Sequence, residues 1–354
     1  MTEAMDILIT KTGRSKLQDI NLENLPFGKY FTDHMLEADY ENGEWKNVEI
    51  KPYQPLLIEP SIAALHYGQA IFEGIKAYRD KDGNAFIFRP IENFKRFNKS
   101  AERMNMPVVP EEIFMEGMRQ LIALDKNWIP SKKDHSLYIR PLMFSTDPML
   151  GVRPSETYKF LILLSPAGPY FASPMKILVE EKYTRAAPGG VGFSKNAGNY
   201  GGSMLAATMA KQKGYDQVLW TDAFEHKWLQ EVGMMNVFFI IDGKAVTPSL
   251  EEGTILEGVT RSSVIQGLKD MGIAVEERKI SIDEVVQAYK ERRLTEVFGT
   301  GTAAVIAPIK ELNYKGFTMS FDPERYVTSS AVKDWLTGIR ECKIPDKYGW
   351  MFKV

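Results

Sequence analysis

The chain has 354 residues, of which 44 are Lys or Arg and 46 are Asp or Glu, so its formal net charge is −2. A protein that neutralises many phosphates usually carries a strongly basic domain or stripe, and this balance therefore argues against a nucleic-acid binder. With 44% hydrophobic residues the composition is that of an ordinary globular protein. At roughly 150 residues per domain, the length predicts about two domains.

Cysteine usage and apolar runs indicate the compartment. Cys342 is the single cysteine, which excludes an intramolecular disulfide and a zinc site of several cysteines. The four histidines lack metal-ligand spacing, so no metal is expected. The first 16 residues hold no apolar stretch typical of a signal peptide, and the longest nearly apolar run, 232–241, is about half of the roughly 20 residues that span a bilayer. We therefore expect a cytoplasmic protein that does not enter a membrane.

The N-terminal half alternates strand and helix patterns. Two β-rich runs, 71–79 and 84–89, flank an Asp-Gly pair, which predicts a hairpin. Over 91–104 apolar residues recur every three or four positions, which predicts an amphipathic helix. A further helix is predicted over 111–126, and strands are predicted over 136–145 and 158–164.

The segment 165–174 contains three prolines and a glycine, a composition typical of a linker. We expect a small N-terminal α+β domain over 1–165, an interdomain loop over 166–175 and a larger mixed α/β domain over 176–354. In this second domain the patterns predict strands over 176–181, 216–221, 235–241, 274–280, 294–299 and 303–307, and helices over 202–213, 261–271 and 282–290.

The commoner catalytic signatures are missing from the sequence: it has no Walker phosphate loop, no HExxH and no GxSxG. The segment 299–304 (GTGTAA) fits the G-x-G-x-x-A form of the dinucleotide fingerprint. That fingerprint requires a helix directly after it, whereas 305–308 predicts a strand. A nicotinamide-dependent oxidoreductase is therefore an alternative that rests on this segment alone.

One glycine-rich segment surrounds a lysine. Over 189–202 six glycines flank Lys195, ahead of a predicted helix. Because glycine costs backbone entropy on folding, this density indicates a main chain that must approach another group closely. The alternative is a flexible surface loop with a solvated lysine.

Three further segments suggest an anion site and a buried charge. Glu231 adjoins an apolar strand, where a cationic partner is expected because an unpaired buried charge is costly. Thr260 stands where the N-cap of helix 261–271 belongs, and a helix N-terminus preceded by glycine readily binds phosphate. The 299–303 turn offers hydroxyls and N–H groups to the same anion. Separately these features also fit an ion pair, an ordinary cap and a glycine-rich turn.

Together these segments match the needs of pyridoxal 5′-phosphate. That cofactor requires a lysine for a Schiff base, an acid opposite the pyridine nitrogen, a donor to the ring O3′ and a cradle for its phosphate. The residues that could fill these roles are, in the same order, Lys195, Glu231, Tyr200, and Arg89 with Thr260 and Thr302.

Seven motifs carry a family resemblance. In chain order they are HYGQAIFEGIKAY, FIFRP, SLYIRP, GFSKNAGNYGGS, EVGMMN, EGVTR and FGTGTAA. They resemble the branched-chain amino acid aminotransferases of the class IV, pyridoxal-phosphate-dependent family. This implies the two-domain D-amino-acid-transaminase-like fold (fold type IV), with α/β and α+β parts, and a homodimer whose loop around Leu150, Gly151 and Val152 reaches the partner's pocket.

The resemblance also implies the cofactor contacts. Lys195 is expected to form the internal aldimine and to move the proton between Cα and C4′. Glu231 would keep the pyridine nitrogen protonated and Tyr200 would hydrogen-bond O3′. The phosphate would be held by Arg89, the main chain at Val259 and Thr260, and Thr302.

A substrate pocket follows from the same resemblance, with Arg140 expected to meet the distal carboxylate of glutamate. Its period-two spacing from Tyr138 puts both on one side of a strand. The α-carboxylate would bind the N–H groups of Thr302 and Ala303 and a tyrosine hydroxyl. The expected pocket residues are Tyr67, Phe72, Tyr138, Arg140 and Tyr170.

The implied reaction is ping-pong transamination of L-leucine, L-isoleucine and L-valine with 2-oxoglutarate, which gives branched-chain 2-oxo acids and L-glutamate. A D-amino acid transaminase and an aminodeoxychorismate lyase share the lysine and glutamate and remain alternatives, although the Tyr67/Phe72 and Tyr138/Arg140 segments favour the branched-chain enzyme.

The sequence departs from the family pattern at two places. Ala304 and Ala307 replace the CxxC pair of animal members, so thiol control is not expected. Met234 replaces a threonine common in the family.

Overall fold

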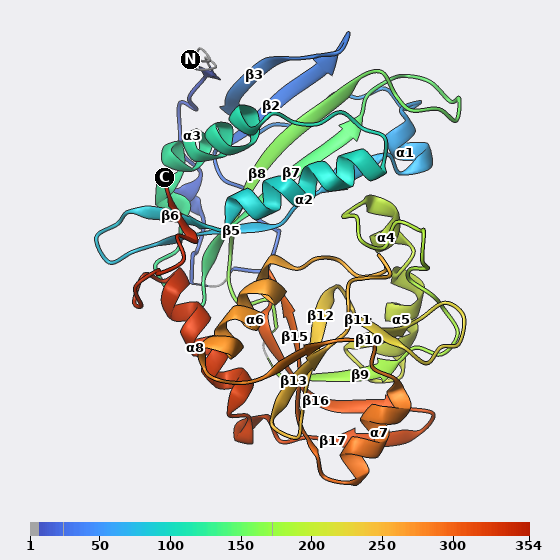
Figure 1. The fold of residues 1–354 in the computed structure, drawn as a ribbon. Coiled ribbons are helices and arrows are strands. Elements are labelled where there is room, and N and C mark those ends of the chain that lie inside the picture. The colour runs from blue at the N-terminus through green and yellow to red at the C-terminus, as the bar shows by residue number, and fades with distance from the viewer. Residues whose placement is uncertain (1–6, 24, 172) are drawn as a thin grey trace. The chain divides into compact units, whose positions relative to one another are not determined.

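A computed structural model describes residues 7–23, 25–171 and 173–354. The chain divides into two compact units, each built around its own sheet (Figure 1). Unit 1 comprises Met1–Tyr170, Lys195–Ala197 and Ile339–Val354, and unit 2 comprises Phe171–Ser194 and Gly198–Gly338. No helix in the described ranges is long and apolar enough to cross a membrane.

The sheet of unit 1 has the strand order β1-β3-β2-β8-β7-β5-β6-β18, with β4 pairing β7. Helices α2 and α3 pack on this sheet (Figure 1), and Phe97 of α2 contacts Phe114 and Phe160 in the core. The strands are β1 (Leu8–Ile9), β2 (His34–Glu41), β3 (Glu44–Pro52), β4 (Ala70–Phe72), β5 (Ile75–Arg79), β6 (Ala85–Phe88), β7 (Ser136–Ser145), β8 (Tyr158–Ala167) and β18 (Met351–Lys353); the helices are α1 (Ala63–Tyr67), α2 (Pro90–Arg103) and α3 (Gly117–Leu124).

Most predicted elements of this unit are confirmed, with three differences. Strand β7 and the β5–β6 hairpin lie where expected. The run 71–79 is split at Glu73 and Gly74. Pro141 of β7 lies opposite and has no N–H to donate there, while its carbonyl accepts from Glu73 N–H at 2.8 Å. The expected helix over 111–126 is a π-helical turn (Glu112–Glu116), α3 and a 3₁₀ turn (Lys126–Trp128). The expected linker begins later, since β8 continues to Ala167.

The sheet of unit 2 has the order β11-β10-β9-β16-β15-β12-β13-β14, with β17 on β16. Strand β12 is buried throughout, which explains its uninterrupted apolar sequence. The strands are β9 (Met175–Val179), β10 (Gln217–Thr221), β11 (Leu229–Val232), β12 (Met235–Ile241), β13 (Lys244–Thr247), β14 (Val275–Glu277), β15 (Leu294–Gly301), β16 (Val305–Tyr314) and β17 (Phe317–Ser320); the helices are α4 (Ala197–Gly201), α5 (Met204–Gln212), α6 (Val259–Asp270), α7 (Ile282–Lys290) and α8 (Thr328–Arg340), with a 3₁₀ turn at Pro323–Arg325.

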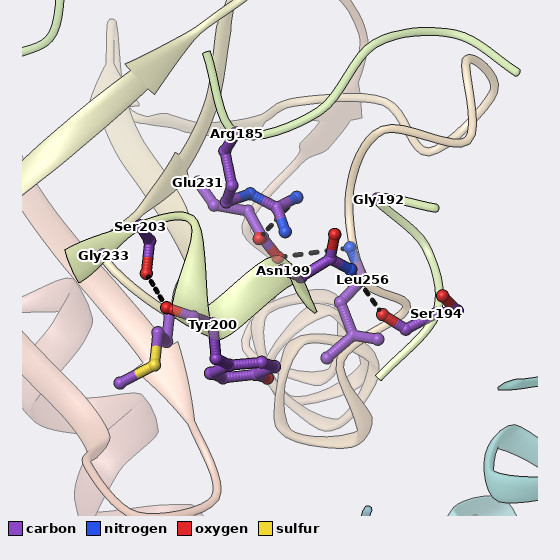
Figure 2. A pocket seen from close by; sticks show the side chains of 10 residues that line it. Arg185, Gly192, Ser194, Asn199, Tyr200, Ser203, Glu231, Gly233 and Leu256 are labelled. Atoms are coloured by element: carbon purple, nitrogen blue, oxygen red, sulfur yellow. Dashed lines mark hydrogen bonds and ion pairs between the residues drawn. The ribbon is translucent and has the colours of Figure 1, made fainter. Parts of the chain in front are cut away.

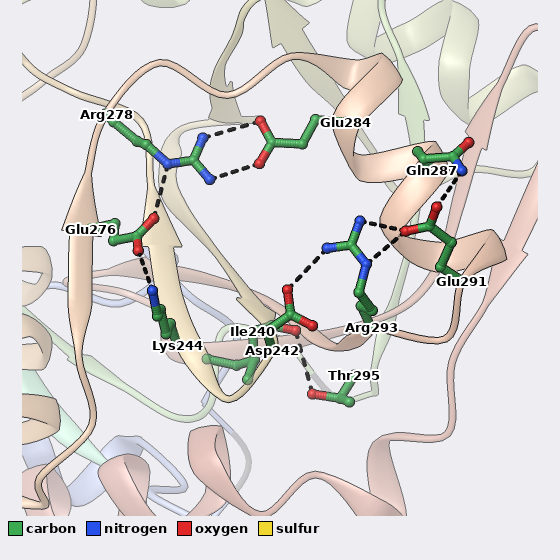
Figure 3. A network of polar contacts seen from close by, with 10 residues as sticks. All are labelled: Ile240, Asp242, Lys244, Glu276, Arg278, Glu284, Gln287, Glu291, Arg293 and Thr295. Atoms are coloured by element: carbon green, nitrogen blue, oxygen red, sulfur yellow. Dashed lines mark hydrogen bonds and ion pairs between the residues drawn. The ribbon is translucent and has the colours of Figure 1, made fainter.

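Ion pairs join α7 and its flanking segments to the sheet of unit 2 (Figure 3). Arg278 pairs with Glu284 of α7 at 2.6 Å and with Glu276 of β14 at 3.0 Å. Arg293, just after α7, pairs with Asp242 at 2.9 Å. Exposed pairs of this kind each contribute little to the stability of a protein.

Two segments of the expected second domain, 195–197 and 339–354, belong to unit 1. The expected domain 176–354 contains Lys195, yet 195–197 group with unit 1, where Phe72 N–H donates to the Lys195 carbonyl at 3.0 Å. The last residues also belong to unit 1, because β18 pairs with β6. These transfers make unit 1 the longer of the two units.

Candidate active site

A pocket in unit 2 surrounds Glu231, the last residue but one of β11 (Figure 2). Two of the residues predicted from the sequence, Glu231 and Tyr200, lie in its wall together with Met234. The side chain of Met234 is 48% exposed, and the methionine therefore borders open space. The lining residues are Arg185, Gly192, Ser194, Asn199, Tyr200, Ser203, Glu231, Gly233, Met234 and Leu256.

Glu231 has the cationic partner that its position predicted. Glu231 is buried, and its carboxylate pairs with the Arg185 guanidinium at 2.8 Å (Figure 2). The other oxygen, Oε1, accepts from Leu256 N–H at 3.2 Å and from the Asn236 side chain at 3.5 Å. Charge-assisted hydrogen bonds to a buried carboxylate fix its orientation. Sequence reasoning did not identify Arg185, which lies far from Glu231 along the chain.

Tyr200 reaches the same pocket from α4. The neighbouring Asn199 side chain donates to the carbonyls of Val191 and Ser194, at 2.8 Å each, and so ties the glycine-rich segment to the start of this helix. The Ser203 hydroxyl donates to the Tyr200 carbonyl at 2.8 Å (Figure 2). These hydrogen bonds of Asn199 hold residues 191–194 against the start of α4.

The N-terminus of α6 differs by two residues from its expected position. The helix begins at Val259 after the N-cap Gly258, so Thr260 is a residue of the first turn and not the cap. A glycine stands at the cap because a Cβ there would overlap Asn236 Oδ1. The first N–H groups of an α-helix have no acceptor within the helix and point toward anions. Thr260, 3% exposed, lies among them.

The expected turn at 299–303 is largely strand. Gly299 to Gly301 complete β15, which pairs antiparallel with β16, and the turn occupies 302–304. The predicted strand after GTGTAA is therefore confirmed, and the missing helix rules out a dinucleotide fingerprint. The buried Thr300 Oγ1 has no hydrogen-bond partner in the described part of the chain. Asn236 pairs with Thr300 across the ladder and also abuts Gly258, so the turn and the start of α6 adjoin.

Lys195 is fixed in unit 1 by its main chain. Its N–H donates to Ser100 Oγ of α2 at 2.9 Å, and its carbonyl accepts from Phe72 N–H. Its Nζ lies 4.7 Å from the centroid of the Phe72 ring. The Arg140 guanidinium carbon lies at the same distance from that centroid. Phe72 thus contacts both cations predicted for the site, in the geometry of cation–π pairs.

The other predicted aromatic residues gather near this cluster. Arg140 donates to the Tyr138 hydroxyl at 3.1 Å. Tyr138 and Tyr170 both pack edge-on against Phe27, with ring centroids 4.8 and 5.0 Å apart. Tyr67 stands apart: it is 47% exposed, and its hydroxyl donates to the Leu150 carbonyl at 2.5 Å.

Glu73 is a residue of this cluster that sequence reasoning missed. Its carboxylate is fully buried and pairs with Arg96 of α2 at 2.7 Å, while its carbonyl accepts from Arg140 at 3.0 Å. Burial alone would raise the pKa of Glu73, but the charge and hydrogen bonds of Arg96, with the charge of Lys195, outweigh it and hold that pKa below its usual range. The one sequence feature that could have pointed to Glu73 is its position as a carboxylate between Phe72 and a glycine.

Arg89 completes the predicted set in unit 1. It is half-buried, it precedes α2 in the left-handed conformation with φ of 48°, and its guanidinium carbon lies 4.8 Å from the Trp350 ring centroid. Burial lowers the pKa of Arg89, as does the charge of Arg340, although Glu92 opposes this. At any pH at which proteins fold the group remains a cation.

Comparison with known proteins identifies the family. The family model described as "Amino-transferase class IV" matches residues 70–312. The chain belongs to the class IV aminotransferases. This aminotransferase is 50% identical over 337 residues to "Branched-chain-amino-acid transaminase 1" of Bacillus subtilis (strain 168), with 94% of each chain covered.

Solved structures agree with this family and with its fold. The branched-chain amino acid aminotransferase of Escherichia coli matches this aminotransferase with a TM-score of 0.75 and 28% identity, covering 90% of this chain and 98% of that one. The T.th. branched-chain amino acid aminotransferase, solved with pyridoxamine 5′-phosphate, matches with a TM-score of 0.70 and 28% identity, covering 89% of this chain and 97% of that one. The resemblance and the fold class stated from the motifs are confirmed.

Proposed function

We propose that this aminotransferase uses pyridoxal 5′-phosphate to transfer the amino group of L-leucine, L-isoleucine or L-valine to 2-oxoglutarate, giving the branched-chain 2-oxo acids and L-glutamate. The observation that carries the proposal is the contact of Lys195 and Arg140 with one aromatic ring, Phe72. It provides a reactive amine, an apolar surface and a cation for a second carboxylate in one cluster. The name of the Bacillus subtilis relative supports branched-chain amino acids as the amino donors.

The residues of unit 2 fit the cofactor. The first N–H groups of α6, at Val259 and Thr260, would bind the phosphate of the cofactor together with the adjoining turn that contains Thr302. The buried hydroxyl of Thr300, which has no hydrogen-bond partner among the described residues, lies beside that turn and supports an anion there. Glu231 would pair with the pyridine nitrogen, and Tyr200 would hydrogen-bond O3′. Arg89 of unit 1 would add a positive charge for the phosphate. The pyridoxamine 5′-phosphate in the T.th. relative points to the same cofactor.

When bound, pyridoxal phosphate supplies an electron sink that stabilises negative charge at the amino acid Cα. The residues of this chain supply the remaining functions. Lys195 Nζ would act as the base that moves the proton between the substrate Cα and C4′ of the cofactor. Glu231, which pairs with Arg185 and accepts a hydrogen bond from Leu256 N–H, would hold a proton on the ring nitrogen.

The substrate site has to accept an apolar side chain in one half-reaction and a carboxylate in the other. Phe72, Tyr138 and Tyr170 offer apolar ring surface to a leucine, isoleucine or valine side chain. Arg140 offers a cation to the distal carboxylate of glutamate. The N–H groups of Thr302 and Ala303, with a tyrosine hydroxyl, would bind the α-carboxylate that both kinds of substrate share.

We further propose a homodimer. Unit 1 exposes an apolar surface that we term the 65–152 patch: Leu65 is 61% exposed, Leu150 60% and Val152 85%. The Tyr67–Leu150 hydrogen bond and the bridge between Ile62 and Pro148 join its two segments. Adjacent apolar residues exposed in this way typically mark a protein interface.

Replacement of Lys195 by alanine tests the cofactor and the role of the lysine. The variant should lose the near-visible absorbance band of protein-bound pyridoxal phosphate and about 10²–10⁴-fold or more of its turnover, because the proton carrier is removed. Absorbance and a coupled glutamate assay measure the two effects. Lys211→Ala, at an exposed lysine of α5, is the matched control and should behave like the wild type. Retention of both band and turnover in Lys195→Ala would refute the proposal.

The substrates are tested with a panel of amino donors and 2-oxoglutarate as acceptor. Leucine, isoleucine and valine should outperform D-alanine, and aminodeoxychorismate should yield no product. Preference for a D-amino acid would overturn the substrate proposal while leaving the role of Lys195 intact.

A further inference from the structure

The C-terminal segment 346–354 lies against the strand that leads to Arg89. Its strand β18 pairs antiparallel with β6, with Met351 opposite Phe88, and Val354 N–H donates to the Ala85 carbonyl at 3.0 Å. The Asp346 carboxylate accepts from Met351 N–H at 2.7 Å and closes the turn before the strand. This segment therefore covers the edge of the sheet at the point where β6 ends.

Two contacts of Trp350 hold Arg89. The Arg89 N–H donates to the Trp350 carbonyl at 2.7 Å, and the guanidinium carbon of Arg89 lies 4.8 Å from the Trp350 ring centroid. Arg89 has φ of 48°, in the left-handed region that costs about 1 kcal/mol for a residue other than glycine. Such a conformation persists when neighbouring structure enforces it, and here the enforcing residue comes from the end of the chain.

Aromatic rings pack around Trp350 on two sides. Its ring stacks on Tyr348, with centroids 4.4 Å apart, and meets the Phe88 ring edge-on at 5.8 Å. The buried Arg340 guanidinium lies 4.3 Å from the Phe88 centroid. Two arginines are therefore held on neighbouring rings. Like charges placed near each other favour an anion between or beside them, which suits a phosphate.

We propose that the C-terminal segment is a positioning element for the cofactor phosphate: Trp350 holds Arg89 in the conformation in which its guanidinium binds that phosphate. This inference rests on the proposed function, because it takes Arg89 as a phosphate ligand. Trp350 is a positioning residue in this scheme, and its effect on binding passes through Arg89.

The test compares the affinities of the full-length chain, stripped of cofactor, for pyridoxal 5′-phosphate and for pyridoxal. Trp350→Ala should weaken the binding of pyridoxal phosphate about 10-fold. It should change the binding of pyridoxal, which has no phosphate, less than about twofold. Trp350→Phe, which keeps an aromatic face, should recover most of the loss. In an Arg89→Gln background the same alanine substitution should have no further effect.

Phe352→Ala is the matched control, because Phe352 lies in the same strand and is 38% exposed. It should leave both affinities unchanged. If Trp350→Ala does not fold, Trp350→Leu replaces it, since leucine retains apolar volume without a π face. An unchanged affinity for pyridoxal phosphate in the variant, or an equal loss for pyridoxal and pyridoxal phosphate, overturns the inference alone. Failure of the wild-type chain to bind pyridoxal phosphate overturns the proposed function.

Discussion

The ion pair of Glu231 with Arg185 has two separable consequences. Both side chains are buried, at 5% and 7% exposure, so removing one partner leaves an uncompensated charge in the interior. The carboxylate is also the group proposed to face the pyridine nitrogen. Arg185 therefore contributes to stability directly and to the reaction through the orientation of Glu231.

We predict that Arg185→Met destabilises the cofactor-free protein by about 3–5 kcal/mol, because Glu231 is left buried without its cation. The double variant Arg185→Met/Glu231→Gln should recover at least half of this loss and yet remain nearly inactive. Chemical denaturation measures the free energies of unfolding, and the glutamate assay measures turnover. Strictly additive free energies in the two single variants and the double variant would show that the pair is not coupled.

At the residue scale, the sequence identifies groups whose chemistry is unusual in their surroundings. Lys195 among glycines and Glu231 beside an apolar strand are both such groups. Arg185 and Glu73 could not be found in this way. The partner of Glu73 on α2 lies 23 positions away, and only folding brings the two together. Ordinary charges become site residues through burial, which local sequence does not report.

Helices and strands were predictable from the sequence where the spacing of apolar residues follows a single helical or strand period without interruption. Strand β7 and helix α7 coincide with their predicted ranges. Predictions shifted where a partner strand sets the boundary: the run before β5 is split opposite Pro141, and β8 continues through Pro166 because it pairs with β7 up to Ala167. The start of α6 also differs from the prediction because of a contact with another strand. A Cβ at the N-cap, residue 258, would overlap Asn236 Oδ1, so glycine is needed there.

This close approach at the cap of α6 gives a prediction. In Gly258→Ala the new Cβ would overlap Asn236 Oδ1 and come within 3.1 Å of Arg261 Cβ. Asn236 also donates to the Leu256 carbonyl at 2.9 Å, so its displacement disturbs the loop that reaches Glu231. We expect a destabilisation of about 1–3 kcal/mol and weaker binding of pyridoxal phosphate, measured by denaturation and titration.

Gly201→Ala in α4 supplies the comparison, because among the described residues no heavy atom outside its chain neighbours and its own helix backbone lies within 4 Å of the Cβ position. In that helix alanine should be neutral or stabilising by up to about 1 kcal/mol. Equal stability of the two variants would contradict the steric account of Gly258.

At the scale of the whole molecule, the division into two units was expected, but the membership of two segments was not. Residues 195–197 and 339–354 belong to a unit far from them in sequence. Both attachments are β-type pairings, Ile71 with Asn196 and β6 with β18. Such pairings depend on exposed main-chain groups of an edge, which one sequence does not mark. They nevertheless bring Lys195 to Phe72 and Trp350 to Arg89.

The 65–152 patch leads to a prediction about assembly. Val152 is 85% exposed on a loop that Arg153 holds through an ion pair with Asp147 at 2.8 Å. If a second copy covers it, Val152→Glu buries a charge twice in a two-fold interface and should raise the dimer dissociation constant by about 100-fold or more. Turnover should fall in parallel, because the loop is proposed to complete the partner's pocket. Sedimentation across a concentration series measures the dissociation constant.

Val327→Glu is the control variant. It adds the same charge outside the patch, at a residue 76% exposed in unit 2, and should keep the wild-type assembly and turnover. A wild-type dissociation constant in Val152→Glu would remove the patch from the dimer interface.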